Sequence, residues 1–124
     1  MKKIQTDKAP LPAGHYSQAV VHNGMVFVSG QIPIDPLTGE KITGSIEDQT
    51  AQVLKNLTAI LEASGSSLAQ VLKVTVYITD ISLWGKVNEV YSQVFGEHKP
   101  ARAIVPTRDL HYGFKIEVEA IAAV

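Results

Sequence analysis

The spacing of hydrophobic and polar residues along this chain predicts short strands interrupted by two longer helices. Residues 18–21 and 25–29 have the character of strands, and Asn23-Gly24 between them favours a tight type I′ hairpin turn. A run rich in β-branched residues in the second half of the chain favours another strand. The further strands that we expect lie at 3–5, 71–79, 102–107 and 114–124.

Two segments repeat apolar residues at helical spacing. The first is expected to begin at Ser45, which can cap the helix together with Asp48, and to end at Gly65. The second is expected to begin with Asp80 or Ser82. Their apolar stripes comprise Val53, Leu54, Leu57, Ile60 and Leu61 in the first, and Leu83, Val87, Val90, Tyr91 and Val94 in the second.

The expected elements follow one another in the order ββ-α-β-α-ββ, with a short additional strand at the N-terminus. Because hairpins bracket the chain, this order favours an α+β fold with a mixed sheet over a doubly wound sheet. The 124 residues contain no repeat, low-complexity tract or linker, so we expect a single domain over 1–124.

Two helices can cover only one face of such a sheet, which leaves the other face to be explained. In the last expected strand, Phe114, Ile116, Val118, Ala120 and Ala122 alternate with Lys115, Glu117, Glu119, Ile121 and Ala123. The second of these sides mixes carboxylates with apolar groups, which is more typical of an interface than of a solvated surface. We therefore expect a closed homo-oligomer, the alternative being an exposed amphipathic face.

Composition excludes several kinds of function. With 11 Lys and Arg against 12 Asp and Glu, the chain lacks the basic excess of a nucleic-acid or membrane-surface protein. No apolar run approaches the roughly 18 residues of a membrane span, and no signal peptide is evident, so we expect a cytoplasmic protein. The absence of cysteine removes disulfides, thiolate ligands and a cysteine nucleophile. The four histidines lack metal-ligand spacing, so no metal is expected.

Arg102 stands near the start of a mostly apolar expected strand, where a guanidinium requires an anionic partner. Its fork of N–H groups suits a ligand carboxylate or phosphate. The alternative is a structural salt bridge to Glu117 or Glu119. These two glutamates share one side of their strand, and they could serve in acid–base catalysis or form plain ion pairs at an interface.

Other residues are candidates for lining a pocket. Tyr16 precedes the first hairpin and can donate a hydrogen bond from its phenol, although it could equally just pack. Gly30 permits close approach of a ligand. Asn88 lies on the second expected helix, where a plain surface position is the alternative. His15 and His111 could each act as a general base, and the sequence favours neither.

These residues lie in stretches that resemble the RidA (YjgF/YER057c/UK114) family of imine deaminases, and the resemblance runs nearly end to end. The most specific stretches are Ser29-Gly30-Gln31-Ile32-Pro33, Pro100-Ala101-Arg102 and Glu117-Val118-Glu119-Ala120-Ile121-Ala122. Further similar stretches are Ala9-Pro10, Tyr16-Ser17-Gln18, Thr38-Gly39-Glu40, Gln49-Thr50 and Val87-Asn88-Glu89-Val90-Tyr91.

The resemblance implies a chorismate-mutase-like fold and a homotrimer, with a central barrel of three sheets and a cleft between neighbouring subunits. It implies hydrolysis of reactive 2-imino and enamino acids, such as 2-iminobutanoate and 2-iminopropanoate, to 2-oxo acids and ammonia, without a cofactor. The alternative is a non-catalytic protein that binds small carboxylates or regulates through the same cleft. A ribonuclease is disfavoured by the charge balance, and a chorismate mutase by the single clear arginine.

The same resemblance implies roles for particular residues. Arg102 would clamp the substrate carboxylate, and Glu117 would hold or activate the attacking water. The family's substrate-binding positions match Tyr16, Gly30, Asn88, Arg102 and Ile104. At Gly30 and Ile104 it is the main chain that would contact the ligand.

The chain departs from the family pattern at three places. Ile104 stands where the family often has cysteine, which excludes thiol chemistry or thiol regulation there. Gly14-His15-Tyr16 replaces the usual G-P-Y, and Leu110-His111-Tyr112-Gly113-Phe114 replaces the usual L-P-K segment. Both histidines are expected near the rim of the cleft, where they would affect substrate preference.

Overall fold

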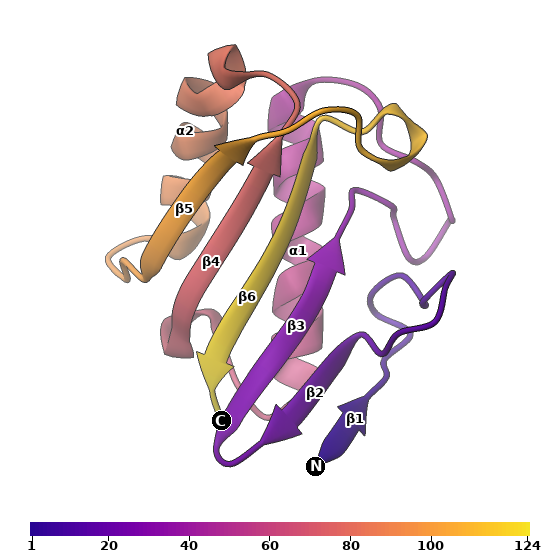
Figure 1. The fold of residues 1–124 in the computed structure, drawn as a ribbon, viewed down its shortest axis with the longest axis vertical. Helices are drawn as coiled ribbons and strands as arrows, with labels where there is room; N and C mark the ends of the chain where they lie inside the picture. Colours follow the sequence, from indigo (N-terminus) through magenta and orange to yellow (C-terminus); the bar gives the residue numbers. More distant parts are fainter.

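The computed structural model describes all residues 1–124 and contains one six-stranded sheet with two helices on one face (Figure 1). The strands are β1 (Lys2–Ile4), β2 (Ala19–His22), β3 (Met25–Gln31), β4 (Val71–Ile78), β5 (Ala101–Pro106) and β6 (Ile116–Ala123). The helices are α1 (Ile46–Ala63) and α2 (Trp84–Phe95). The strand order is β1-β2-β3-β6-β4-β5, and only the β4–β5 pair is parallel. The expected α+β fold is confirmed.

Local sequence explains most element boundaries. Asn23 and Gly24 both have positive φ, at 50° and 75°, as a type I′ turn between β2 and β3 requires. Ser45 caps α1 by accepting a hydrogen bond from the Asp48 N–H at 3.1 Å. Gly65 follows the end of α1 with a φ of 81°. The hairpin and the first helix therefore lie where the sequence predicts them.

The second helix differs from the prediction in its first residue and at one position of its apolar stripe, while Val87 and Tyr91 are buried as predicted. Asp80 caps a short 3-10 turn by accepting from the Ser82 N–H at 2.8 Å, and α2 itself begins only at Trp84. Val94, expected on the apolar stripe, is exposed, and Phe95 is buried instead. The reason is the spacing of four residues from Val87 to Tyr91 and again to Phe95, which places these three on one side of the helix.

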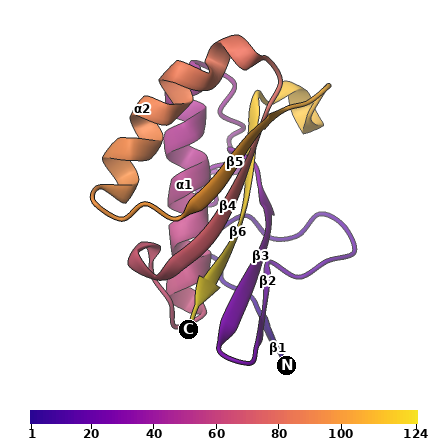
Figure 2. The ribbon, with the colours of Figure 1, turned by 60° about the vertical axis from the view of Figure 1, so that its left-hand side comes forward.

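The face of the sheet opposite the helices has no covering layer (Figure 2). We call it the open face; it carries Met25, Phe27, Lys73, Thr75, Tyr77, Ala103, Val105, Glu117, Glu119, Ile121 and Ala123. On this face Phe27 is 42% exposed and Val105 is 38% exposed. The residues that alternate with the open-face residues along β3, β4 and β6 point towards the helices and are largely buried. The predicted mixture of charged and apolar groups on one side of β6 is confirmed. Neither helix is long and apolar enough to cross a membrane.

Candidate functional site

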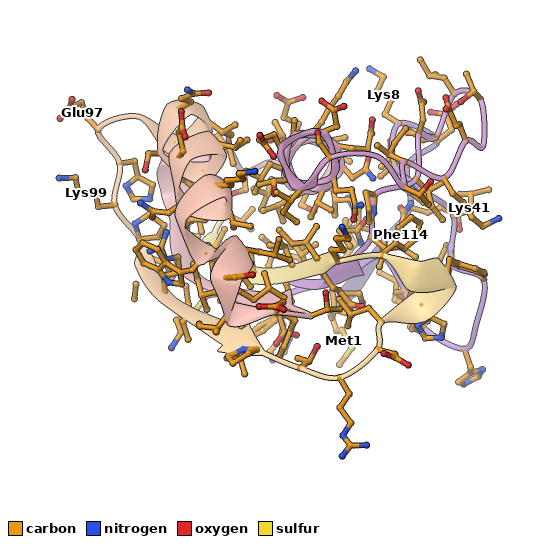
Figure 3. All side chains as sticks on the ribbon, turned by 90° about the horizontal axis from the view of Figure 1, so that it is seen from above. Met1, Lys8, Lys41, Glu97, Lys99 and Phe114 are labelled. Atoms are coloured by element: carbon orange, nitrogen blue, oxygen red, sulfur yellow. The ribbon has the colours of Figure 1, made fainter.

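The residues expected to form the site fall into two groups that lie apart within one chain. Arg102 and Asn88 line a cavity beside the edge strand β5 and helix α2, whereas Tyr16, Gly30 and Glu117 line a second cavity. Lys99 lines the first cavity, and Lys41 packs on Tyr112, next to the second. Figure 3 shows these two lysines on opposite sides of the molecule. The two groups therefore line two separate cavities, the Arg102 cavity and the Glu117 cavity.

Arg102 is held rigidly on the helix side of β5. It pairs in register with the buried Val74, so its side chain projects towards the helices. Its Nη1 donates a hydrogen bond to Asn88 Oδ1 at 2.9 Å. The guanidinium centre lies 4.6 Å from the ring centre of Tyr91 and 5.7 Å from that of Trp84. One N–H donor of Arg102 is thus bonded to the neutral Asn88 amide, and the positive charge of the guanidinium has no carboxylate partner.

The alternative of a structural salt bridge between Arg102 and Glu117 or Glu119 is wrong for a single chain. Glu117 pairs with Tyr77 and Glu119 with Thr75, so both glutamates project from the open face. Arg102 projects from the opposite face, and the sheet separates the charges.

The cavity around Arg102 has a volume of about 420 Å³, and Tyr91 is one of its lining residues. Tyr91 is only 6% exposed, and its hydroxyl has no hydrogen-bond partner. Burial raises the pKa of the Tyr91 hydroxyl, although the positive charge of Arg102 opposes this. The guanidinium, which has no carboxylate partner, suits an anionic ligand, whereas the Tyr91 hydroxyl is buried beneath it without a hydrogen-bond partner. Sequence reasoning assigned Tyr91 to the apolar stripe, and its hydroxyl was the one clue to a further role.

The second cavity, of about 280 Å³, is lined by Tyr16, Ser29, Gly30, Ile32, His111 and Glu117. The β3–β6 register shifts between Val28 and Gln31, which places an irregularity at Gly30 beside Glu117. A Cβ built on Gly30 would collide with the Glu117 carboxylate. Glycine at this position therefore makes the space that the glutamate occupies.

Glu117 is partly removed from solvent, and this burial raises the pKa of its carboxyl group. His111 opposes the rise in pKa, and Glu119 adds to it. The two glutamates are not equivalent, because Glu119 Oε1 accepts a hydrogen bond from the Tyr77 hydroxyl at 2.6 Å. That hydrogen bond is the main reason why the pKa of Tyr77 is raised. Glu117 is thus the carboxylate that faces the cavity.

A family model described as Endoribonuclease L-PSP matches residues 6–124. A 2-iminobutanoate/2-iminopropanoate deaminase of Rattus norvegicus is 45% identical over 98% of this chain and 88% of its own. The crystal structure of RidA from the Antarctic bacterium Psychrobacter is 43% identical, with a TM-score of 0.95 and coverage of 100% of both chains. This chain belongs to the RidA family. A RutC family protein of Pyrococcus horikoshii is 55% identical over 96% of this chain and 94% of its own.

In this member of the RidA family, buried polar contacts fix the loop that carries Tyr16. Gln18 is almost fully buried, donates from Nε2 to the Pro10 carbonyl at 2.8 Å and accepts from the Thr6 N–H at 2.7 Å. Ser29 Oγ donates to the Ser17 carbonyl at 2.6 Å. These bonds hold the N-terminal segment against β3, so Tyr16, although 53% exposed, stands over the Glu117 cavity.

Ile104 lies two residues beyond Arg102 on the same side of β5, as the alternation predicts. Its side chain packs against the hydrophobic core. Because β5 is an edge strand, its main-chain groups on the outer side have no strand partner. The backbone of Ile104, rather than its side chain, is therefore available for contact with a ligand. No three His, Asp or Glu side chains are placed to hold a metal ion.

Proposed function

We propose that this chain is a RidA-type deaminase, which hydrolyses reactive 2-imino acids such as 2-iminobutanoate and 2-iminopropanoate to 2-oxo acids and ammonia. The observation that carries the proposal is Arg102, a guanidinium that is fixed by Asn88 and two aromatic rings but lacks an anionic partner. The name of the relative from Rattus norvegicus supports the same substrate class.

Each group has a definite task in this reaction. Arg102 binds the substrate carboxylate through two parallel N–H donors, which orients the imine carbon. Glu117 accepts a proton from a water molecule as the water oxygen bonds to that carbon. The protonated Glu117 carboxyl returns this proton to the nitrogen of the resulting carbinolamine. The C–N bond then breaks and releases ammonia, while the carbinolamine hydroxyl gives its proton to the Glu117 carboxylate and becomes the carbonyl of the 2-oxo acid. That proton passes on to ammonia or to solvent. Burial raises the pKa of Glu117, which makes its carboxylate a stronger base towards the water molecule.

A complete site requires two copies of the chain, because Arg102 and Glu117 project from opposite faces of one sheet. The free edge of β5 and the exposed apolar residues of the open face offer surfaces for such packing. We propose a homotrimer in which Arg102 of one copy lies near Glu117 of the next. A closed ring of this kind joins the Arg102 cavity of each copy to the Glu117 cavity of the next, so three equal clefts result.

The family description also names an endoribonuclease. The chemistry of these cavities favours the imine substrate, since the cavity around Glu117 contains a carboxylate and the chain carries a net charge of −1. An RNA path requires a row of cations that neutralise phosphates. RNA cleavage is therefore an outcome that the experiment should exclude.

The proposal is tested by generating 2-iminobutanoate with a threonine dehydratase and trapping the remaining imine with semicarbazide. The protein should reduce the trapped product, and Arg102→Ala should lose this effect. Arg108→Ala, which removes an exposed arginine outside both cavities, is the matched control and should behave as wild type. Binding of a 2-oxo acid without imine hydrolysis would overturn the enzymatic proposal in favour of a carboxylate-binding or regulatory role. Degradation of added RNA that Arg102→Ala abolishes would favour the nuclease.

A further inference from the structure

The turn between β5 and β6 has an unusual backbone. Tyr112 has φ 58° and ψ 19°, and Gly113 follows with φ 73°. Asn23 is the other non-glycine residue with positive φ, and asparagine tolerates that conformation far better than tyrosine does. A strained residue of this kind persists only where its surroundings hold it, and such residues gather at functional sites.

Three contacts hold this turn in place. The Lys41 ammonium lies 4.7 Å from the Tyr112 ring centre. The Tyr112 ring packs edge-to-face on the Phe114 ring, with 5.8 Å between the ring centres. Phe114 is fully buried, and its N–H donates to the His111 carbonyl at 3.0 Å. Figure 3 shows Lys41 and Phe114 on the same side of the molecule. The turn therefore fixes His111 rather than leaving it on a loose loop.

The imidazole of His111 lines the same cavity as Glu117, and it is exposed whereas Glu117 is half-buried. The other titratable groups that face Glu117 are Glu119 on its own strand, Tyr77 on β4 and Tyr16 on the N-terminal loop. Glu119 raises the pKa of Glu117, and His111 lowers it. Of these neighbours within one chain, His111 is the one that can carry a positive charge. Lys41 packs on the Tyr112 ring and does not line this cavity.

We propose that His111 is a positioning residue for imine hydrolysis, whose imidazolium keeps Glu117 in the ionised form that can accept a proton from water. This inference rests on the proposed deaminase function. The half-buried carboxylate lacks much of its hydration, and a cation at the mouth of the cavity replaces part of it. In the proposed trimer Arg102 of a second copy would add a charge, but that charge is constant over the working pH range. Any difference in pH profile between the His111 variants would therefore come from the charge of residue 111 and not from Arg102.

The test compares His111→Gln, which removes the charge, with His111→Lys, which makes it permanent. In the pH profile of kcat/KM, His111→Gln should move the acid limb to higher pH, and His111→Lys should leave it at or below the wild-type position. His22→Gln, at the exposed end of β2 and outside both cavities, is the control and should not shift the profile.

A second measurement does not depend on turnover. Titration of isotope-labelled glutamate carboxyls by NMR should show a higher pKa for Glu117 in His111→Gln than in wild type. An acid limb and a Glu117 titration that are the same in all three proteins would overturn the inference, as would an equal loss of activity at every pH. If wild type did not hydrolyse imines at all, the proposed function would fail, while the NMR titration would still decide whether His111 controls Glu117.

Discussion

Gly30→Ala should lower the proposed imine hydrolysis by about a hundredfold while leaving the fold intact. The Cβ of alanine would overlap the Glu117 carboxylate, whereas ordinary van der Waals contacts of a Cβ lie at 3.4–4 Å. The carboxylate must therefore move by about 1 Å, and a misplacement of that size can lower a rate by about a hundredfold. Because Gly30 does not have positive φ, alanine introduces no backbone strain, and the free energy of unfolding should change by less than about 1 kcal/mol.

The imine-trapping assay measures this loss, and denaturant unfolding measures stability. Gly85→Ala is the matched control, since nothing lies within 4 Å of a Cβ there and alanine favours the helix, so its activity should equal wild type. Adding Glu117→Asp to Gly30→Ala shortens the carboxylate, so the two losses should not add. Wild-type activity in Gly30→Ala would refute the placement of Glu117 at the reaction.

Three further outcomes are expected. Tyr91→Phe removes a buried hydroxyl that has no hydrogen-bond partner, so chemical denaturation should show unchanged or slightly higher stability. A marked loss of stability would contradict this expectation. Phe27→Glu places a charge on the open face, so sedimentation velocity should show monomers for this variant and the proposed trimer for wild type. The same sedimentation for both proteins would argue against the proposed interface. Within a single chain, burial raises the pKa of Glu117, so its ionised form destabilises the folded state. In the monomeric Phe27→Glu background, Glu117→Gln should therefore raise the free energy of unfolding at about pH 7 but not at about pH 3, where the glutamate is protonated in both states. An equal change at both pH values would mean that packing, not charge, is responsible.

The elements of this fold follow from local sequence. Asn23-Gly24 determines a hairpin because both residues accept positive φ, and Ser45 begins a helix because its side chain replaces a missing backbone acceptor. The alternation along β6 separates a buried side from a mixed side, which already points to an uncovered sheet face. These features depend on residues only a few positions apart in the chain, so they can be predicted from periodicity and from the rules of turns and helix caps. The start of α2 escaped prediction because a 3-10 turn and a helix share the same capping residues.

The choice of candidate residues also came from the sequence and its family resemblance, but their grouping did not. Tyr16, Gly30 and Glu117 line one cavity although about a hundred residues separate the first from the last, and Asn88 bonds directly to Arg102. Nothing in the sequence distinguished His111 from His15. The turn at Tyr112 brings His111 to the Glu117 cavity, whereas His15 does not line it.

The sequence by itself determined the strands and helices, the two sides of β6 and the residues able to do chemistry. Only the tertiary structure decided that Arg102 and Glu117 leave the sheet on opposite faces. That outcome depends on the order β6-β4-β5 and on a register in which a one-residue slip would reverse every side chain. Register is set by the packing of many buried side chains against both helices at once, and no local stretch of sequence contains that information.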